Sequence, residues 1–431
     1  MPLTSIIWML LVFTGSVLSL AKSPFYGLLT YLFIYFVVPA SSINWWAAAI
    51  PDFRWSLLSA VILLISCFIH KEQLSKIRLG SIGPGKWLTA FLVLSIFISF
   101  FAVNQERSFN RCYDFFRLII TFFLIIKCIR NNKQLGYVLL LILLCGFFLG
   151  YQAYNTPRHG GRLEGVGTLD TSDANGFALL LATIVPFGLP VFFSDTKYLR
   201  YLAIPCLVFI FNGIVLCNSR GAVLSLAVSM IVFIFLIKIA KLKIKIIIAA
   251  LICVCAFACL ADDTFWERVS TIGKSARTDK GSGRLTIWLE GLEMVKDYPF
   301  GTGGDGFQVL SPSYITNLTE GIRSSHNTYL LVLVEQGYLG LAIFLCLNFN
   351  VFFILRRGRR SFLSELDSDQ FDKSKRFIYL ANIALTAALA GHLTGAIFGS
   401  RLYYVYYYII ISISIATAYL TEIKSYNFSR S

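Results

Sequence analysis

The stretch GSGRLTIWLEGLEMVKDYPFGTGGDGF, residues 281–307, decides how this chain of 431 residues is organised. It lies inside a polar, glycine-rich segment, residues 262–325, that separates two long series of apolar runs. Apolar runs of about 18 residues or more pack as membrane spans, whereas the loops between spans carry most binding and catalytic residues. We therefore expect the polar segment to hold the chemistry of a membrane protein.

The composition is typical of a polytopic helical membrane protein. Hydrophobic residues make up 57% of the chain and charged residues only 14%, with a mean hydropathy of +0.70. A soluble domain is usually about a quarter charged. Apolar runs of about 18 residues or more recur along the whole length, whereas the short alternating segments of a transmembrane β-barrel are absent. The predicted fold is therefore all-α, with about 12–13 transmembrane helices.

Thirteen candidate spans follow from these runs, and twelve remain if the first two or the last two form a re-entrant pair. They are 3–20, 24–39, 55–70, 87–103, 113–130, 135–154, 174–194, 199–217, 221–239, 244–261, 327–355, 377–398 and 402–420. This divides the chain into an N-terminal transmembrane bundle (1–261), a loop that carries the motifs (262–325) and C-terminal transmembrane helices (326–431).

The distribution of charge predicts the orientation. The net charge of +15 is concentrated in short loops that alternate along the chain, as the positive-inside rule requires of cytoplasmic loops, so we expect no nucleic-acid partner. The loops on the external side are then 40–54, 104–112, 155–173, 218–220 and 262–325. The ten cysteines lie in or beside apolar spans and none lies in 262–325, which predicts neither a disulfide framework nor a zinc site. The D-x-D at 367–369 is interpreted as a solvated acidic patch and not as a metal site.

Three helices are predicted to begin on the external face, each next to a residue that can carry positive charge. Asn218 or Ser219 can cap the span that starts with Arg220, and Ser324 or Ser325 can cap the span that starts near His326. Ser282 can cap an amphipathic helix from about Gly283 to Asp297, with Arg284 in its first turn. The apolar stripe expected on that helix, which would lie on the membrane surface, is Leu285, Trp288, Leu292 and Val295.

Arg220 and Arg284 stand where the helix dipole disfavours a cation, so the pattern indicates an anion held between them. Arginine adds a bidentate clamp for phosphate. Taken singly, each arginine better fits a side chain that reaches toward lipid headgroups, but the coincidence of three such helix starts on one face favours the anion. A helix N-terminus also disfavours the charged form of His326, which would leave a neutral ring able to act as a general base.

The roles of several other polar residues are left open by the sequence. Arg162, Glu164, Asp170, Asp173 and Asn175 fit sugar hydroxyls and fit a helix cap with a solvated turn equally well. The run 301–306 lacks the lysine of a phosphate-binding loop and is predicted to form a tight turn. Glu335, His392 and Arg401 lie in or near spans, where charge is costly, and have no assigned role.

Five motifs together resemble the superfamily of O-antigen ligases and polymerases. They are NSRGA at 218–222, SGR-x3-W at 282–288, D-x-P-x-G-x-G-x2-GF at 297–307, HN-x-YL at 326–330 and E-x-G-x2-G at 335–340. The resemblance is strongest from about residue 160 to residue 355, and the arrangement of spans agrees with it over the whole chain.

The resemblance implies a GT-C-like glycosyltransferase that needs no metal, cofactor or nucleotide sugar. With a direct displacement at the anomeric carbon, we expect it to invert the configuration there. Such proteins take a glycan from undecaprenyl pyrophosphate on the periplasmic face of the bacterial inner membrane and pass it to a hydroxyl of lipid A-core, another glycan or a protein. The catalytic residues carry over onto His326, Arg220 and Arg284. Substrate binding is expected of Arg162, Trp288, Asn327 and Tyr329.

Two other functions compete with a ligase. A polymerase uses the same donor and extends another lipid-linked repeat, and nothing in the sequence separates the two. A transporter of lipid-linked glycans belongs to a different class, which usually shows internal repeats or charged groups at the bilayer midplane. No clear repeat is present here. The glycan, the acceptor and the oligomeric state are not determined by the sequence.

Overall fold

The computed structural model describes residues 1–77, 82–158, 163–194, 196–261, 263, 265–266, 284–315, 321–366 and 372–428, with side chains described as far as residue 421. Its helices are α1 (Leu3–Ala21), α2 (Pro24–Phe36), η1 (Trp45–Ala49), α3 (Trp55–Ile69), η2 (Lys71–Gln73), α4 (Gly83–Ser99), α5 (Gln105–Cys128), α6 (Asn132–Asn155), α7 (Ala174–Phe192), α8 (Lys197–Leu216), α9 (Arg220–Leu236), α10 (Ala240–Leu260), α13 (Arg284–Asp297), α14 (Gly306–Tyr314), α15 (Thr328–Arg360), α16 (Lys373–Gly395), η4 (Ala396–Phe398) and α17 (Val405–Phe428). No strand occurs in the described ranges. The acidic patch at 367–369 lies outside them.

A helix coincides with every one of the thirteen predicted spans. Among the described residues, seven helices are long and apolar enough to cross a membrane: α1, α6, α7, α8, α10, α15, and α16 with η4. Five shorter apolar helices (α2, α3, α4, α9 and α17) and the more highly charged α5 account for the other six predictions. The chain is therefore an all-α polytopic membrane protein, as predicted.

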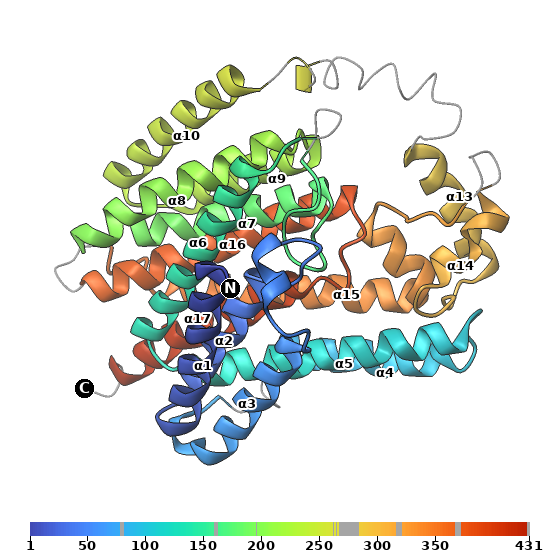
Figure 1. The fold of residues 1–431 in the computed structure, drawn as a ribbon, viewed down its shortest axis with the longest axis horizontal. Coiled ribbons are helices and arrows are strands. Elements are labelled where there is room, and N and C mark those ends of the chain that lie inside the picture. The colour runs from blue at the N-terminus through green and yellow to red at the C-terminus, as the bar shows by residue number, and fades with distance from the viewer. Residues whose placement is uncertain are drawn as a thin grey trace.

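Helices α7 and α16 form the centre of the bundle (Figure 1). Most side chains of both helices are buried. Helix α16 packs against α7, α9 and α17, and α7 also packs against α6 and α8. Helix α15 packs against α4 and α17, and α10 packs against α9 at the edge of the molecule. Helices α13 and α14 lie together beside the start of α15 and carry the polar segment.

One predicted boundary is wrong. The segment 104–112 was expected to be an external loop, but α5 begins at Gln105, and Asn104 caps it by accepting a hydrogen bond from the backbone N–H of Arg107 at 3.0 Å. The charges near the start of α5 lower its mean hydropathy, so a window that averages over all faces of a helix misses its first two turns.

Helix α15 is broken at Gly337, whose φ of 66° is not helical. The glycine-rich turn, residues 301–306, lies against this break. The backbone N–H of Thr302 donates to the carbonyl of Val334 at 2.9 Å, and the next N–H of the turn donates to the next carbonyl of the helix at 3.0 Å. The turn thus supplies donors to carbonyls that lose their helical partners at the break. The prediction of a tight turn is confirmed.

The same turn is tied to the start of α5. The backbone N–H of Gly304 donates to Ser108 Oγ at 2.9 Å, and Arg111 Nε donates to Asp305 Oδ1 at 2.8 Å. Because one turn contacts both α5 and the break in α15, it anchors the polar segment to these two helices of the bundle.

Gly303→Ala tests this turn. Gly303 has a φ of 85°, and an added Cβ would lie 2.3 Å from the Cβ of Ala102. We expect the strain and the clash to destabilise the protein by about 2 kcal/mol or more, measured as thermal unfolding in detergent. Gly136→Ala in α6 is the control, since its nearest neighbour is the Phe377 ring at 3.5 Å. Equal unfolding temperatures for the two variants would contradict the role given to the turn.

Candidate active site

The N-terminus of α9 forms one side of the site. Arg220 is the first residue of this helix and its side chain is exposed. Ser219 occupies the capping position, as one of the two predictions had it, but makes no capping hydrogen bond. Its hydroxyl instead donates to Asn175 Oδ1 at 2.9 Å. The backbone N–H groups in the first turn of α9 therefore donate no hydrogen bond to the Ser219 hydroxyl.

Helix α13 brings the second arginine to the site. It begins at Arg284, close to the predicted start, while the expected cap, Ser282, lies outside the described residues. The predicted apolar stripe is only partly right. Val295 is buried, but Leu285 and Leu292 are 54% and 45% exposed. The helix instead packs through Ile287, Gly291, Met294 and Val295, which leaves its exposed leucines on another face.

Trp288 joins α13 to the segment that precedes α15. Its indole N–H donates to the carbonyl of Ser325 at 3.1 Å. Tyr329, another expected substrate contact, points into the bundle, where its hydroxyl donates to the carbonyl of Leu393 on α16 at 3.0 Å. The polar groups of both residues thus make structural hydrogen bonds.

Asn327, and not Ser324 or Ser325, caps α15. Its Oδ1 accepts the backbone N–H groups of Tyr329 and Leu330 at 2.9 and 3.1 Å. The predicted capping serines are engaged elsewhere, because both hydroxyls lie within 2.8 Å of Ser400 Oγ. Asn327 was expected to bind substrate, but its carbonyl oxygen holds the helix start.

His326 lies one residue before this cap, in the left-handed conformation with a φ of 46°. Its ring reaches solvent, although the surrounding protein partly desolvates it. This burial lowers the pKa of His326, and the positive charges of Arg284 and Arg401 lower it further. The effect of Arg284 and Arg401 exceeds that of the nearby Asp173 carboxylate, which acts in the opposite direction. The ring is therefore neutral near pH 7 and can accept a proton.

Arg401 is a component of the site that sequence reasoning left unassigned. Its side chain is only 5% exposed and pairs with Asp173, with Nη1 and Oδ2 3.2 Å apart. Its guanidinium stacks on the Tyr404 ring at 4.6 Å, and its backbone N–H donates to Thr328 Oγ1 at 2.8 Å. The available signal was an arginine just before a tyrosine-rich apolar span, where a buried charge needs a partner.

A small cavity marks where these groups meet. Arg284, Arg401, Asn175, Ser219 and Gly221 line it, together with apolar side chains. Its volume of about 20 Å³ suits a single water molecule. The structure thus brings Arg284 to the start of α9, and two of the cavity's lining residues flank Arg220 in the chain.

The remaining candidate residues that the structure describes lie outside the cavity lining, and most of them make contacts that hold the fold together. Asp173 caps α7 by accepting two backbone N–H groups, at 3.1 and 3.0 Å. Asp170 accepts a hydrogen bond from Tyr35 and another from the start of α17. Glu164 is exposed, and Arg162 lies outside the described residues. His392 is buried in the bundle and stacks on Tyr407 at 4.9 Å.

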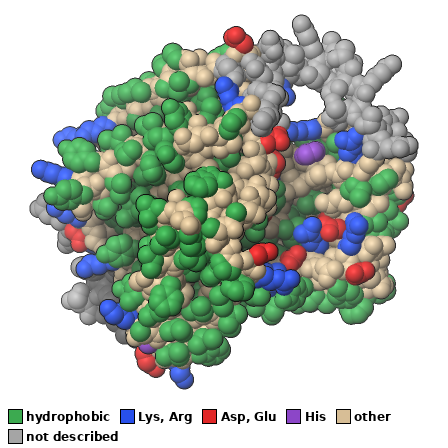
Figure 2. Space-filling model, in the orientation of Figure 1, with side chains coloured by type: hydrophobic (Ala, Val, Ile, Leu, Met, Phe, Trp, Pro, Cys, Tyr) green, Lys and Arg blue, Asp and Glu red, His purple; other side chains and the backbone are tan. Residues whose placement is uncertain are grey.

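Figure 2 shows that this face of the molecule is hollowed, with a His and several Lys or Arg side chains on one side and Asp, Glu, Lys and Arg on the other. Within the described ranges, no group of three or more His, Cys, Asp and Glu side chains converges to hold a metal. Two arginines, Arg284 and Arg401, line the cavity beside the first residues of α9, and guanidinium groups bind anions.

Comparison with known proteins gives one match. Residues 205–345 match the family described as O-antigen ligase. This range contains Arg220, Arg284 and His326. A search of curated proteins found no match.

Arg284→Gln will raise the pKa of His326, because removing a nearby positive charge makes the imidazolium form less unfavourable. The titration can be followed by NMR of histidine-labelled protein, with His326→Ala used to assign the signal. Lys296→Gln is the control, since this exposed α13 lysine pairs with Glu293 and not with the site. An unchanged or lowered pKa in Arg284→Gln would show that the two residues do not interact as described.

Proposed function

We propose, from the match of residues 205–345 to the O-antigen ligase family, that this protein transfers a glycan from undecaprenyl pyrophosphate to an acceptor hydroxyl, such as one on lipid A-core. The proposed place of transfer is the periplasmic face of the bacterial inner membrane. The observation that carries the proposal is the position of neutral His326 beside Arg284 and Arg401, within electrostatic reach of both.

The arginines suit the leaving group. Breaking the bond between the anomeric carbon and the diphosphate leaves negative charge on the diphosphate oxygens. Fixed positive groups stabilise such charge best when they are already in place. Arg284 and the N-terminus of α9 meet at one cavity, and Arg220 is the first residue of that helix. We therefore assign Arg220 and Arg284 to the diphosphate.

His326 suits the acceptor. In the proposed step, the acceptor oxygen forms a bond to the anomeric carbon while the bond to the diphosphate oxygen breaks and its electron pair leaves with undecaprenyl diphosphate. The acceptor proton moves to the neutral ring of His326. This is a single displacement, so the configuration at the anomeric carbon inverts.

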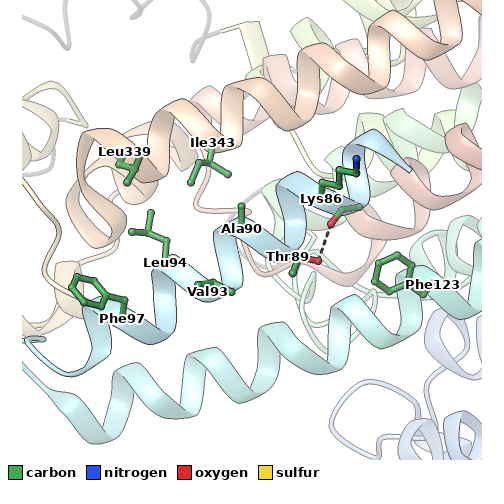
Figure 3. A pocket seen from close by; sticks show the side chains of 10 residues that line it. Lys86, Thr89, Ala90, Val93, Leu94, Phe97, Phe123, Leu339 and Ile343 are labelled. Carbon is green, nitrogen blue, oxygen red and sulfur yellow. Dashed lines mark hydrogen bonds between the residues drawn. The ribbon is translucent and has the colours of Figure 1, made fainter. Parts of the chain in front are cut away.

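An apolar groove supports a lipid-linked donor (Figure 3). Its volume is about 690 Å³, and it runs between α4 and α15, chiefly past Ala90, Val93, Leu94, Phe97, Leu339 and Ile343. Leu339 lies two residues after the break in α15, and the glycine-rich turn is hydrogen-bonded to that break. A polyprenyl tail fits such an apolar channel, and we place the tail of the donor there.

A transfer assay tests the proposal. Purified protein would receive undecaprenyl-pyrophosphate-linked glycan and lipid A-core in the presence of a chelator. We expect transfer by the native protein and a loss of about 100-fold or more in His326→Ala, the usual contribution of a general base. Arg284→Gln should lose activity similarly, whereas Lys296→Gln should keep it.

The products also separate the alternatives. Growth of glycan on the lipid-linked donor, with no transfer to lipid A-core, would make the protein a polymerase. A covalent glycosyl-enzyme, retention of configuration or full activity of His326→Ala would rule out the proposed mechanism.

A further inference from the structure

Helix α5 has three distinct faces. One is buried in the bundle and includes Ser108, Cys112, Phe115, Ile119 and Phe122. A second is apolar yet exposed, as expected for contact with lipid, and consists of Phe109, Tyr113, Phe116 and Ile120. The third, here called the polar face, carries Arg107, Arg111, Asp114, Arg117 and Thr121. These five residues follow the spacing i, i+4, i+7, i+10 and i+14, which places them on one side of a helix.

The polar face extends deep into the membrane. Arg117 lies eleven residues before Cys128, the last residue of α5, which corresponds to about 16 Å of helix. Lys127 and Arg130 mark the cytoplasmic boundary by the positive-inside rule. Arg117 is therefore near the middle of a hydrocarbon core of about 30 Å. A charge at this depth facing lipid would cost several kcal/mol, so such residues face protein or water-filled cavities.

The charged side chains of this face are partly exposed, and Arg117, at the edge of the face, lies over the ring of Tyr113 at 5.6 Å. The side chains of Arg111, Asp114 and Arg117 are 35%, 46% and 48% exposed, although apolar residues separate them in sequence. Figure 2 shows Lys or Arg and Asp or Glu side chains beside the hollow on this side of the molecule. Arg111, on this face, pairs with Asp305 of the polar segment, so this end of the polar face borders the same side of the molecule as the candidate active site.

Two consecutive tyrosines connect the polar face to the active site. Arg111 lies over the Tyr403 ring at 5.2 Å, and Arg401 lies over the Tyr404 ring at 4.6 Å. Both tyrosines are partly exposed. The Tyr403 hydroxyl donates to Glu335 Oε2 at 2.9 Å. Adjacent Cα atoms are about 3.8 Å apart, so the two arginine–tyrosine pairs meet the chain at the same point, just before α17.

We propose that the polar face of α5, together with Tyr403, binds the saccharide of the acceptor. This rests on the proposed function, which needs two glycan substrates in one hollow. The groups on the two sides of the hollow differ in chemistry. The site around Arg284, His326 and Arg401 is rich in cations and suits a diphosphate.

The polar face offers both donors and acceptors, as sugar hydroxyls require. Arg117 donates to Asp114 Oδ1 at 3.2 Å, and Arg111 donates to Asp305 Oδ1, so each guanidinium is held beside a carboxylate. Glu335 is fully buried and holds the Tyr403 ring in place by accepting the hydrogen bond from its hydroxyl. Tyr403 supplies an aromatic ring of the kind that packs on sugar faces. Alternating donors and acceptors are matched by hydroxyl groups, each of which can donate and accept.

Kinetics of the full-length protein test the assignment. With lipid A-core as the acceptor, we expect Arg117→Gln to raise the acceptor KM about tenfold or more, with kcat and the donor KM changed less than about twofold, because lost hydrogen bonds to a charged group weaken binding by that order. Arg117→Lys should recover part of the loss. Arg130→Gln, just beyond the cytoplasmic end of the same helix, is the control and should match the native protein.

An unchanged acceptor KM in a folded Arg117→Gln protein would overturn the proposal. So would a rise confined to the donor KM, which would assign the polar face to the donor. Absence of transfer by the native protein to any acceptor would count against the proposed function itself. A separate labelling experiment then tests whether the polar face is open to water and binds the acceptor.

Cysteine labelling tests the polar face without any reaction. In a chain whose exposed Cys253, Cys255 and Cys259 are replaced by serine, Arg117→Cys should react with a charged, membrane-impermeant thiol reagent, and added lipid A-core should slow that reaction. Phe116→Cys, on the lipid-facing side, should react at least tenfold more slowly. Equal rates for the two variants, or a rate for Arg117→Cys that lipid A-core leaves unchanged, would overturn the proposal.

Discussion

The break in α15 is the constraint on which the site depends. A helix that stops being helical inside a membrane protein leaves carbonyl groups without donors, and lipid supplies none. Here the glycine-rich turn fills that need at Val334 and at the next carbonyl. Glycine at 303 lets the turn adopt the φ of 85° that this approach to the helix requires. Since the turn also binds α5, the polar segment has one position relative to the bundle.

The electrostatics of the site follow from that position. With α13 held against α15, Arg284 comes close enough to His326 to lower the pKa of the ring. A cluster of like charges would be unfavourable without a balancing group, and Asp173 provides one by pairing with the buried Arg401. Asp173 also caps α7, which fixes it in place. The site therefore combines arginine side chains with a neutral histidine, which is the combination that the proposed displacement of a diphosphate by a hydroxyl requires.

The sequence predicted the helices well and the site only in outline. Long apolar runs leave little choice of secondary structure, so each predicted span is a helix. The positions of Arg220, Arg284 and His326 at or near helix starts followed from the order of the spans and from the capping residues beside them. Capping was predicted less well, because Ser325 and Asn327 are both good capping residues and only tertiary contacts decide between them. Arg401 was not assigned, since its partner Asp173 lies 228 residues away in the chain.

Helix α5 shows why hydropathy finds spans and can miss function. Averaging over all faces placed the start of the span after Arg107 and Arg111, although the helix contains both. The individual faces carry the missing information. A span that meets lipid on one side and the bundle on a second needs a third, polar side only where water or a ligand reaches it. The α4–α15 groove is apolar, whereas the neighbouring α5 face is charged. The two surfaces would let one protein hold a lipid tail and a sugar within the same depth of membrane.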